Sequence, residues 1–245
     1  MENIICQWLC IFAAIFRTNC LQTATEDVTS DTLCVFDIDM VLIQPLDPAF
    51  QIPNMQKYES SRYTENLMPS ENGRLINQVS RLPSTLVESD APCIIRRLTY
   101  KDALLLGLAN TVAKEPNESE KIERLRKLGI SFRPIIEKEL VLTDLPRMHG
   151  SFPAYREGIL FTNEISKAKV LVDFLQKSQL CVKRVVYIDD VKRNIQDMEK
   201  ALKDFDPAIE FTGYLYTGAA EYLSEEISKE QFDRSWQKLI DSIQN

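Results

Sequence analysis

The sequence is poor in several residue types that particular functions require. It has only 7 glycines and 1 histidine, His149, and neither GxGxxG nor GxxxxGK[ST] occurs, so a glycine-rich phosphate-binding loop is excluded. None of the 6 cysteines belongs to a CxxC pair, and a zinc site is therefore not expected. Acidic residues outnumber basic ones by 36 to 29, which gives a net charge of -7. This balance argues against a nucleic-acid-binding face, which would have to be basic.

The first 24 residues differ in composition from the rest of the chain. Residues 4–16 are an uninterrupted run without a charge, too short to cross a bilayer comfortably but of the length of a signal-peptide core. We predict that residues 1–24 are a signal peptide, which would export the protein to the periplasm or beyond. The alternative is a buried N-terminal helix of a cytoplasmic protein. Neither interpretation includes a stable membrane span.

From residue 31 onward, segments with strand patterns alternate with segments with helix patterns. This alternation predicts an α/β fold with a mainly parallel sheet. Cysteines 34, 93 and 181 lie in or beside apolar runs and are expected to be buried free thiols. Strands are predicted over 32–36, 103–109, 158–162, 184–188 and 209–216, and helices over 118–128, 167–177, about 194–202 and 219–243.

Residues 45–98 interrupt this alternation. The segment is polar and rich in proline, and it has helical patches only near 74–82 and 94–98. A long insertion directly after the first strand predicts a cap over the carboxyl edge of the sheet, within a core that spans 31–245.

Polar side chains follow several of the predicted strands at their carboxyl ends, where open α/β sheets bind ligands. Carboxylates that converge on one point repel each other unless a cation lies among them, and oxygen ligands of this kind suit Mg²⁺. A lysine at the same edge would balance the remaining charge and contact a phosphoryl oxygen. The residues at these ends are Asp37 and Asp39, Asn110 and Thr111, Lys167, and Asp189 with Asp190.

Three of these motifs together resemble the haloacid dehalogenase superfamily. The family's first motif, hhhhDxDx[TV], is matched by LCVFDIDMV with Asp37 and Asp39, its later lysine by Lys167, and its final acidic motif by VVYIDD. Order and spacing agree over roughly residues 31–220. FDIDMVL, FTNEISKAKVL, VVYIDDVKRNI and FTGYLYTGA resemble, more narrowly, a poorly characterised group of exported bacterial proteins of this superfamily.

The resemblance implies a three-layer Rossmannoid fold with a cap and a role for each motif residue. Asp37 would be the nucleophile that accepts the phosphoryl group, and Asp39 would protonate the leaving oxygen and then activate water. Lys167 would stabilise the nucleophile and the transferring charge. The ligands of Mg²⁺ would be Asp37, the backbone carbonyl of Asp39, and Asp189, with Asp190 supporting them directly or through water.

Several positions leave alternatives open. Ala109 stands where the resemblance places a threonine, so Thr111 or Asn110 would have to contact the phosphoryl oxygens. Met40 occupies a position that is usually small or polar. Lys169 competes with Lys167, although only Lys167 directly precedes the apolar helix face. Asp190 is also a candidate N-cap of the following helix.

Two functional hypotheses follow from these observations. The first is a Mg²⁺-dependent phosphohydrolase that cleaves a small phosphomonoester through an aspartyl phosphate. The second is a catalytically weakened relative that binds a ligand or a protein through its cap. A receiver domain is excluded, because its lysine follows the acidic cluster whereas Lys167 precedes Asp189. The oligomeric state and the identity of the substrate have no signature in the sequence.

Overall fold

The computed structural model describes residues 14–65 and 67–244. An eight-stranded sheet has the order β1-β10-β9-β2-β5-β8-β7-β6. Neighbouring strands from β1 to β8 are parallel, and β7 and β6 add antiparallel strands at one edge. The predicted α/β class with a mainly parallel sheet is therefore confirmed. In this order, the strands are β1 (Ala14–Thr18), β10 (Glu210–Tyr216), β9 (Arg184–Asp189), β2 (Thr32–Asp37), β5 (Leu104–Ala109), β8 (Ile159–Phe161), β7 (Ala154–Arg156) and β6 (Leu140–Val141).

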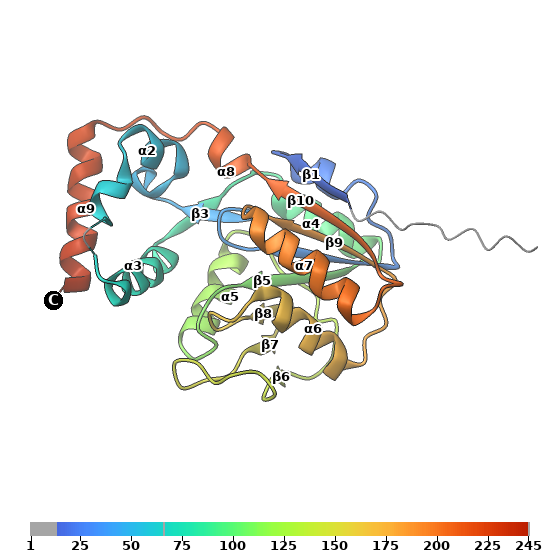
Figure 1. Ribbon diagram of the computed structural model, residues 1–245. Coiled ribbons are helices and arrows are strands. Elements are labelled where there is room, and N and C mark those ends of the chain that lie inside the picture. Colours follow the sequence, from blue (N-terminus) through green and yellow to red (C-terminus); the bar gives the residue numbers. More distant parts are fainter. Residues whose placement is uncertain (1–13, 66, 245) are drawn as a thin grey trace, which may run out of the picture.

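The central strands are hydrophobic because helices cover both faces of the sheet, as is usual for parallel sheets. All six residues of β2 are buried. One face packs against α6 (Lys167–Ser178) and α7 (Lys192–Phe205), and the other against α1 (Leu21–Ala24), α4 (Ala91–Tyr100) and α5 (Asn117–Lys127). Figure 1 shows the resulting three layers.

The predicted strand at 158–162 is part of a hairpin, in which β8 pairs with the short β7. Gly158 makes the turn with φ of +79°, and a Cβ there would lie 2.5 Å from Cβ of Phe132. Only glycine fits this backbone conformation and this space without strain.

An insertion follows β2, as predicted, and contains a small sheet of its own. Its strands β3 (Ile43–Pro45) and β4 (Ser84–Leu86) are antiparallel, and between them lie η1 (Pro48–Phe50), α2 (Ile52–Lys57), η2 (Ser60–Tyr63) and α3 (Pro69–Arg81). In Figure 1, α2 and α3 stand beside the core with β3 leading to them. The helical patch at 94–98 belongs to α4, whose apolar residues pack in the core cluster with the sheet.

The C-terminal segment forms two helices where one was predicted, α8 (Gly218–Glu221) and α9 (Lys229–Gln244). Helix α9 packs on the insertion rather than on the sheet (Figure 1). Phe232 and Trp236 on α9 are 0% and 4% exposed, and the Trp236 indole donates a hydrogen bond to the carbonyl of Ala49 at 3.0 Å. Phe232, Trp236 and Leu239 have the spacing of one helix face, and all three are buried against elements that are distant in sequence.

The predicted N-terminal segment lies partly outside the described residues. Its last part belongs to the fold, because β1 pairs with β10 and Leu21 on α1 is fully buried. Within the ranges 14–65 and 67–244, no helix is both long enough and apolar enough to cross a membrane.

The prediction of buried cysteines is right for Cys34 and wrong for Cys93 and Cys181, which are exposed. Cys93 lies on α4 between the buried Pro92 and Ile94, but the helical turn points it away from the core. Cys181 follows α6 in the loop that leads to β9. An apolar neighbour in the sequence does not place a side chain on the buried face.

Candidate functional site

The carboxyl end of β2 carries two aspartates, which both line a cavity of about 400 Å³. Asp37 is the last residue of the strand, 6% exposed, and its Oδ1 accepts a hydrogen bond from the backbone N–H of Ile38 at 2.8 Å. The Asp39 side chain is 40% exposed. Met40 follows with φ of +63°, so the chain turns sharply at this point and leaves both carboxylates at the sheet edge.

The carboxyl end of the neighbouring strand β9 adds Asp189 and Asp190. Asp190 lines the same cavity, whereas Asp189 is fully buried. One oxygen each of Asp37, Asp189 and Asp190 lies within 4.8 Å of the others. The Asp189 carboxylate accepts hydrogen bonds from Lys167 Nζ, Tyr187 Oη, the backbone N–H of Val191 and Asn194 Nδ2.

Lys167, the first residue of α6, lies between two of these carboxylates. Its Nζ is 2.7 Å from Asp37 Oδ2 and 2.8 Å from Asp189 Oδ2. Lys169, the competing candidate, is exposed on the same helix. Of the two lysines, the fold therefore places Lys167 in the acidic cluster.

The cluster has more negative charge than Lys167 balances. Burial raises the pKa of Asp37, and the neighbouring Asp189 and Asp190 raise it further against the opposing effect of Lys167. Burial, followed by repulsion from Asp189, raises the pKa of Asp190 to about 6. Burial alone would lower the pKa of Lys167, but its two carboxylate partners outweigh this effect and raise it. Protonated carboxyls or a further cation are the two ways to relieve this excess charge.

The two candidates after β5 point to different places. Asn110 lines the cavity with the aspartates, and its Oδ1 accepts a hydrogen bond from Thr162 Oγ1 at 3.0 Å. Thr111 is 8% exposed and lines a second, smaller cavity. The structure thus brings Asn110, and not Thr111, to the acidic cluster.

Lys121 is a member of the site that sequence reasoning missed. It lies on α5, its side chain is 2% exposed, and its Nζ is 2.7 Å and 2.8 Å from the two oxygens of Asp39. A signal existed in the sequence, because residues 118, 121, 122 and 125 have the spacing of one helix face. That spacing places Lys121 on the same buried side as Ile122 and Leu125.

The apolar wall of the larger cavity was also missed. Leu75 and Val79 come from α3 and Trp236 from α9, so the insertion and the C-terminal helix complete the cavity that the sheet edge begins. His149 does not line this cavity; its Nε2 is 2.7 Å from Glu164 in an exposed loop.

The arrangement combines three carboxylates close together with a buried lysine and a fourth carboxylate, and all of these residues except Asp189 line one cavity. Carboxylate oxygens are the ligands that hard divalent cations prefer. Three of them within 4.8 Å form a possible site for such an ion, and Asp37 and Asp39 face the space where a bound molecule would lie.

Comparison with known proteins places the chain among bacterial relatives. It is 25% identical over 233 residues to "Uncharacterized protein RP296" of Rickettsia prowazekii, an alignment that covers 90% of this chain and 84% of that protein. A protein of Rickettsia typhi, RT0286, is also 25% identical, over 83% of this chain and 77% of the relative. A Chlamydia trachomatis protein named "Putative outer membrane protein" is 26% identical over 54% of this chain and 47% of its own length. The family model described as "Protein of unknown function (DUF2608)" matches residues 17–245, and the chain therefore belongs to the DUF2608 family.

Proposed function

We propose that this protein is a phosphohydrolase of the haloacid dehalogenase type, which cleaves a small phosphomonoester with the help of Mg²⁺. The observation that carries the proposal is the acidic cluster on two neighbouring strands. Oxygens of Asp37, Asp189 and Asp190 lie within 4.8 Å of one another, and Lys167 contacts two of these residues.

The donor set fits Mg²⁺, because it consists of carboxylate oxygens at the edge of an open cavity. Asp37 and Asp190 line this cavity and are the candidates for direct contact with the ion. Asp189 is enclosed by four donor groups and would act mainly by holding Lys167. The backbone carbonyl of Asp39 would complete the protein ligands. When bound, the ion would neutralise charge on the carboxylates and on the phosphoryl group.

Each residue then has one chemical role. Asp37 attacks phosphorus and forms an aspartyl phosphate. Asp39 gives a proton to the leaving oxygen and later takes one from the water that hydrolyses the intermediate. The 40% exposure of its side chain gives that water access. Lys167 stabilises the negative charge that Asp37 and the phosphoryl oxygens share.

Two further residues support this chemistry. Lys121 contacts both oxygens of Asp39 and so fixes the orientation of the acid–base carboxylate. Asn110 accepts a hydrogen bond through Oδ1, which directs Nδ2 as its donor for a phosphoryl oxygen. This amide replaces the threonine that the resemblance would place after the second strand.

Hydrolysis of p-nitrophenyl phosphate, with Mg²⁺ and with EDTA, tests the proposal. Asp37→Asn should lose roughly a thousandfold or more of the Mg²⁺-dependent rate, as nucleophile substitutions commonly do. Asp197→Asn, on the exposed face of α7, is the matched control and should keep the wild-type rate. A panel of phosphorylated metabolites extends the assay to other leaving groups. Equal rates for wild type and Asp37→Asn, or no Mg²⁺-dependent hydrolysis of any ester, would refute the proposal.

The proposal includes export of the protein across a membrane. The apolar run at 4–16 supports export, and so does the name of the Chlamydia trachomatis relative, "Putative outer membrane protein". Removal of residues 1–24, the segment predicted from the sequence, would take β1 and the buried Leu21 out of the fold. We therefore place the cleavage before Ala14, which leaves the pairing of Ala14–Thr18 with β10 intact. Mass spectrometry of the protein recovered from the periplasm of an expressing bacterium tests this; recovery of the full-length chain from the cytoplasm alone contradicts it.

A further inference from the structure

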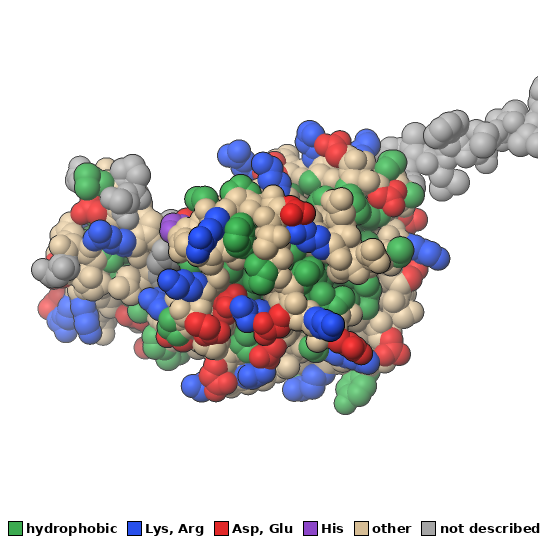
Figure 2. Space-filling view, turned by 90° about the horizontal axis from the view of Figure 1, so that it is seen from below, with side chains coloured by type: hydrophobic (Ala, Val, Ile, Leu, Met, Phe, Trp, Pro, Cys, Tyr) green, Lys and Arg blue, Asp and Glu red, His purple; other side chains and the backbone are tan. Residues whose placement is uncertain are grey.

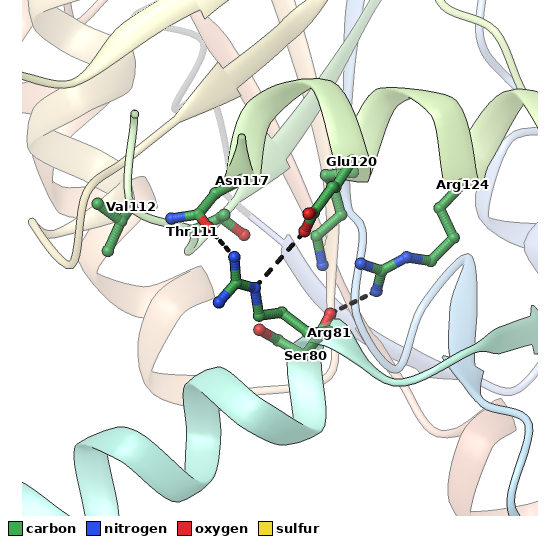
Figure 3. A pocket seen from close by; sticks show the side chains of 8 residues that line it. Ser80, Arg81, Thr111, Val112, Asn117, Glu120 and Arg124 are labelled. Carbon is green, nitrogen blue, oxygen red and sulfur yellow. Dashed lines mark hydrogen bonds and ion pairs between the residues drawn. The ribbon is translucent and has the colours of Figure 1, made fainter. Parts of the chain in front are cut away.

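A second cavity of about 130 Å³ lies between the end of α3 and helix α5. Figure 3 shows the side chains that surround it: Ser80 and Arg81 come from α3, Thr111 from the loop after β5, and Glu120 and Arg124 from α5. The space is large enough for a small anionic group, since one water needs only about 10–15 Å³ of such volume.

Thr111 gives the first sign that this cavity binds a ligand. The residue is 8% exposed, and its buried Oγ1 has no hydrogen-bond partner among the described residues. A buried hydroxyl without a partner is unfavourable. In Figure 3 the Thr111 side chain faces the space that Arg81 and Glu120 border, where a bound acceptor would satisfy it.

The charges around the cavity give the second sign. Lys121 is paired with Asp39 at 2.7 Å, and Arg81 with Glu120 at 3.5 Å. Arg124 has no carboxylate within 4.0 Å among the described residues; its guanidinium donates to backbone carbonyls, including that of Leu82 at 3.3 Å. Burial lowers the pKa of Arg124, and the nearby carboxylates of Asp39 and Glu120 offset only part of this effect. Three cations therefore share two carboxylates.

The second cavity adjoins the proposed active site. Ser80 lines both cavities, and Lys121, on the wall of the smaller one, contacts Asp39 on the wall of the larger one. The two cavities are therefore adjacent and share part of one wall.

We infer that the smaller cavity binds a second anionic group of the substrate, a carboxylate or a second phosphate, through Arg124 and Thr111. The inference rests on the proposed function and narrows the substrate to phosphomonoesters with two anionic ends. Guanidinium groups bind both kinds of anion through paired N–H donors, and the Thr111 hydroxyl supplies a further donor.

Calorimetric titration of full-length Asp37→Asn protein in Mg²⁺ tests the inference without requiring turnover. The ligands are alkyl phosphates of graded length, the matching ω-carboxyalkyl phosphates and the matching alkane bisphosphates. At least one ligand with an anionic group at each end should bind about tenfold more tightly than the alkyl phosphate of the same length. One charge-assisted hydrogen bond contributes a free energy of this order. The carboxylate and bisphosphate series show which anion the cavity prefers.

Three variants in the Asp37→Asn background locate the effect. Arg124→Gln should abolish the advantage, and Thr111→Val should reduce it several-fold. Arg126→Gln should retain it, because Arg126 is exposed on the same helix and pairs with Glu157. Thr111→Val loses only an unpartnered hydroxyl and should fold. If Arg124→Gln does not fold, Thr111→Val therefore still shows whether the smaller cavity binds the second anionic group.

No advantage at any chain length, or an advantage that survives both Arg124→Gln and Thr111→Val, overturns the inference. Failure of the wild-type protein to hydrolyse esters would instead overturn the proposed function, while the binding preference would still be measurable. The two failures are thus distinguishable.

Discussion

The ion pair between Lys121 and Asp39 predicts an unequal response to removal of either partner. Lys121 is enclosed, with 2% of its side chain exposed, whereas 40% of the Asp39 side chain is exposed. Asp39→Asn would leave a buried ammonium without a counterion. Lys121→Met would leave a carboxylate that water can reach, and it would replace the buried charge by an apolar chain of similar length.

The magnitudes follow from these exposures. Removal of one partner from a fully buried pair costs about 3–5 kcal/mol. Water reaches Asp39, and asparagine can still accept one hydrogen bond, so we expect Asp39→Asn to lower the free energy of unfolding by about 2 kcal/mol. Lys121→Met should lower it by less than about 1 kcal/mol, because an exposed carboxylate loses little when its partner is removed. The double variant should be close to Lys121→Met alone.

Urea unfolding in EDTA, followed by circular dichroism, measures the free energy of unfolding of the wild type, the two single variants and the double variant. These four proteins form a double-mutant cycle. For a chain of this size, 2 kcal/mol corresponds to roughly 4–8 °C in Tm. Lys127→Met is the matched control, because Lys127 is 73% exposed on the same helix and should change the stability by no more than about 0.5 kcal/mol. Equal losses for the two single variants, or losses that add in the double variant, would refute the reasoning.

Three further predictions concern packing, pH and metal. Gly213→Ala would place a Cβ 2.3 Å from Ile195 Cγ2 and should destabilise by about 1–3 kcal/mol, whereas Gly73→Ala, in α3 with nothing within 4 Å, should stabilise by up to about 1 kcal/mol; urea unfolding compares them. Burial raises the pKa of Glu88, so the folded state holds that proton more tightly and stability should fall as the pH rises from the ordinary carboxyl value through the raised one. Glu88→Gln should flatten this part of the stability profile, and an unchanged profile would contradict the assignment. Asp190→Asn should weaken the stabilisation that Mg²⁺ gives to the wild type, about 2.7 kcal/mol at a hundredfold excess over Kd; thermal unfolding with and without Mg²⁺ shows whether the increment falls.

Much of the core could be predicted because its signals are local. Strands buried on both faces are continuous apolar runs, and helices such as α6 have apolar residues at helical spacing, so their positions follow from neighbouring residues alone. The acidic residues at the ends of β2 and β9 could be predicted to converge, because parallel neighbouring strands bring their carboxyl ends to one edge.

The remaining features depend on contacts between distant residues. The pairing of Lys121 with Asp39 spans 82 positions, and the contact of Trp236 with Ala49 spans 187. No local pattern specifies such partners, because each side chain's neighbours depend on how whole elements pack. The wrong expectation for Cys93 has a different cause: its neighbours in the sequence are apolar, but the turn of its own helix places it on the exposed face.

The sequence by itself determined the α/β class, the order of the central elements, the insertion after the first strand and the aspartates at the sheet edge. Periodicity and strand termini contain that information, since they reflect the burial of each element separately. Only the tertiary structure decided that Asn110 faces the carboxylates while Thr111 faces a second cavity. It also decided that α9 packs on the insertion and contributes Trp236 to the wall of the larger cavity. These outcomes depend on the turn after β5 and on helix packing over long sequence distances, where small changes in backbone direction send adjacent side chains into different spaces.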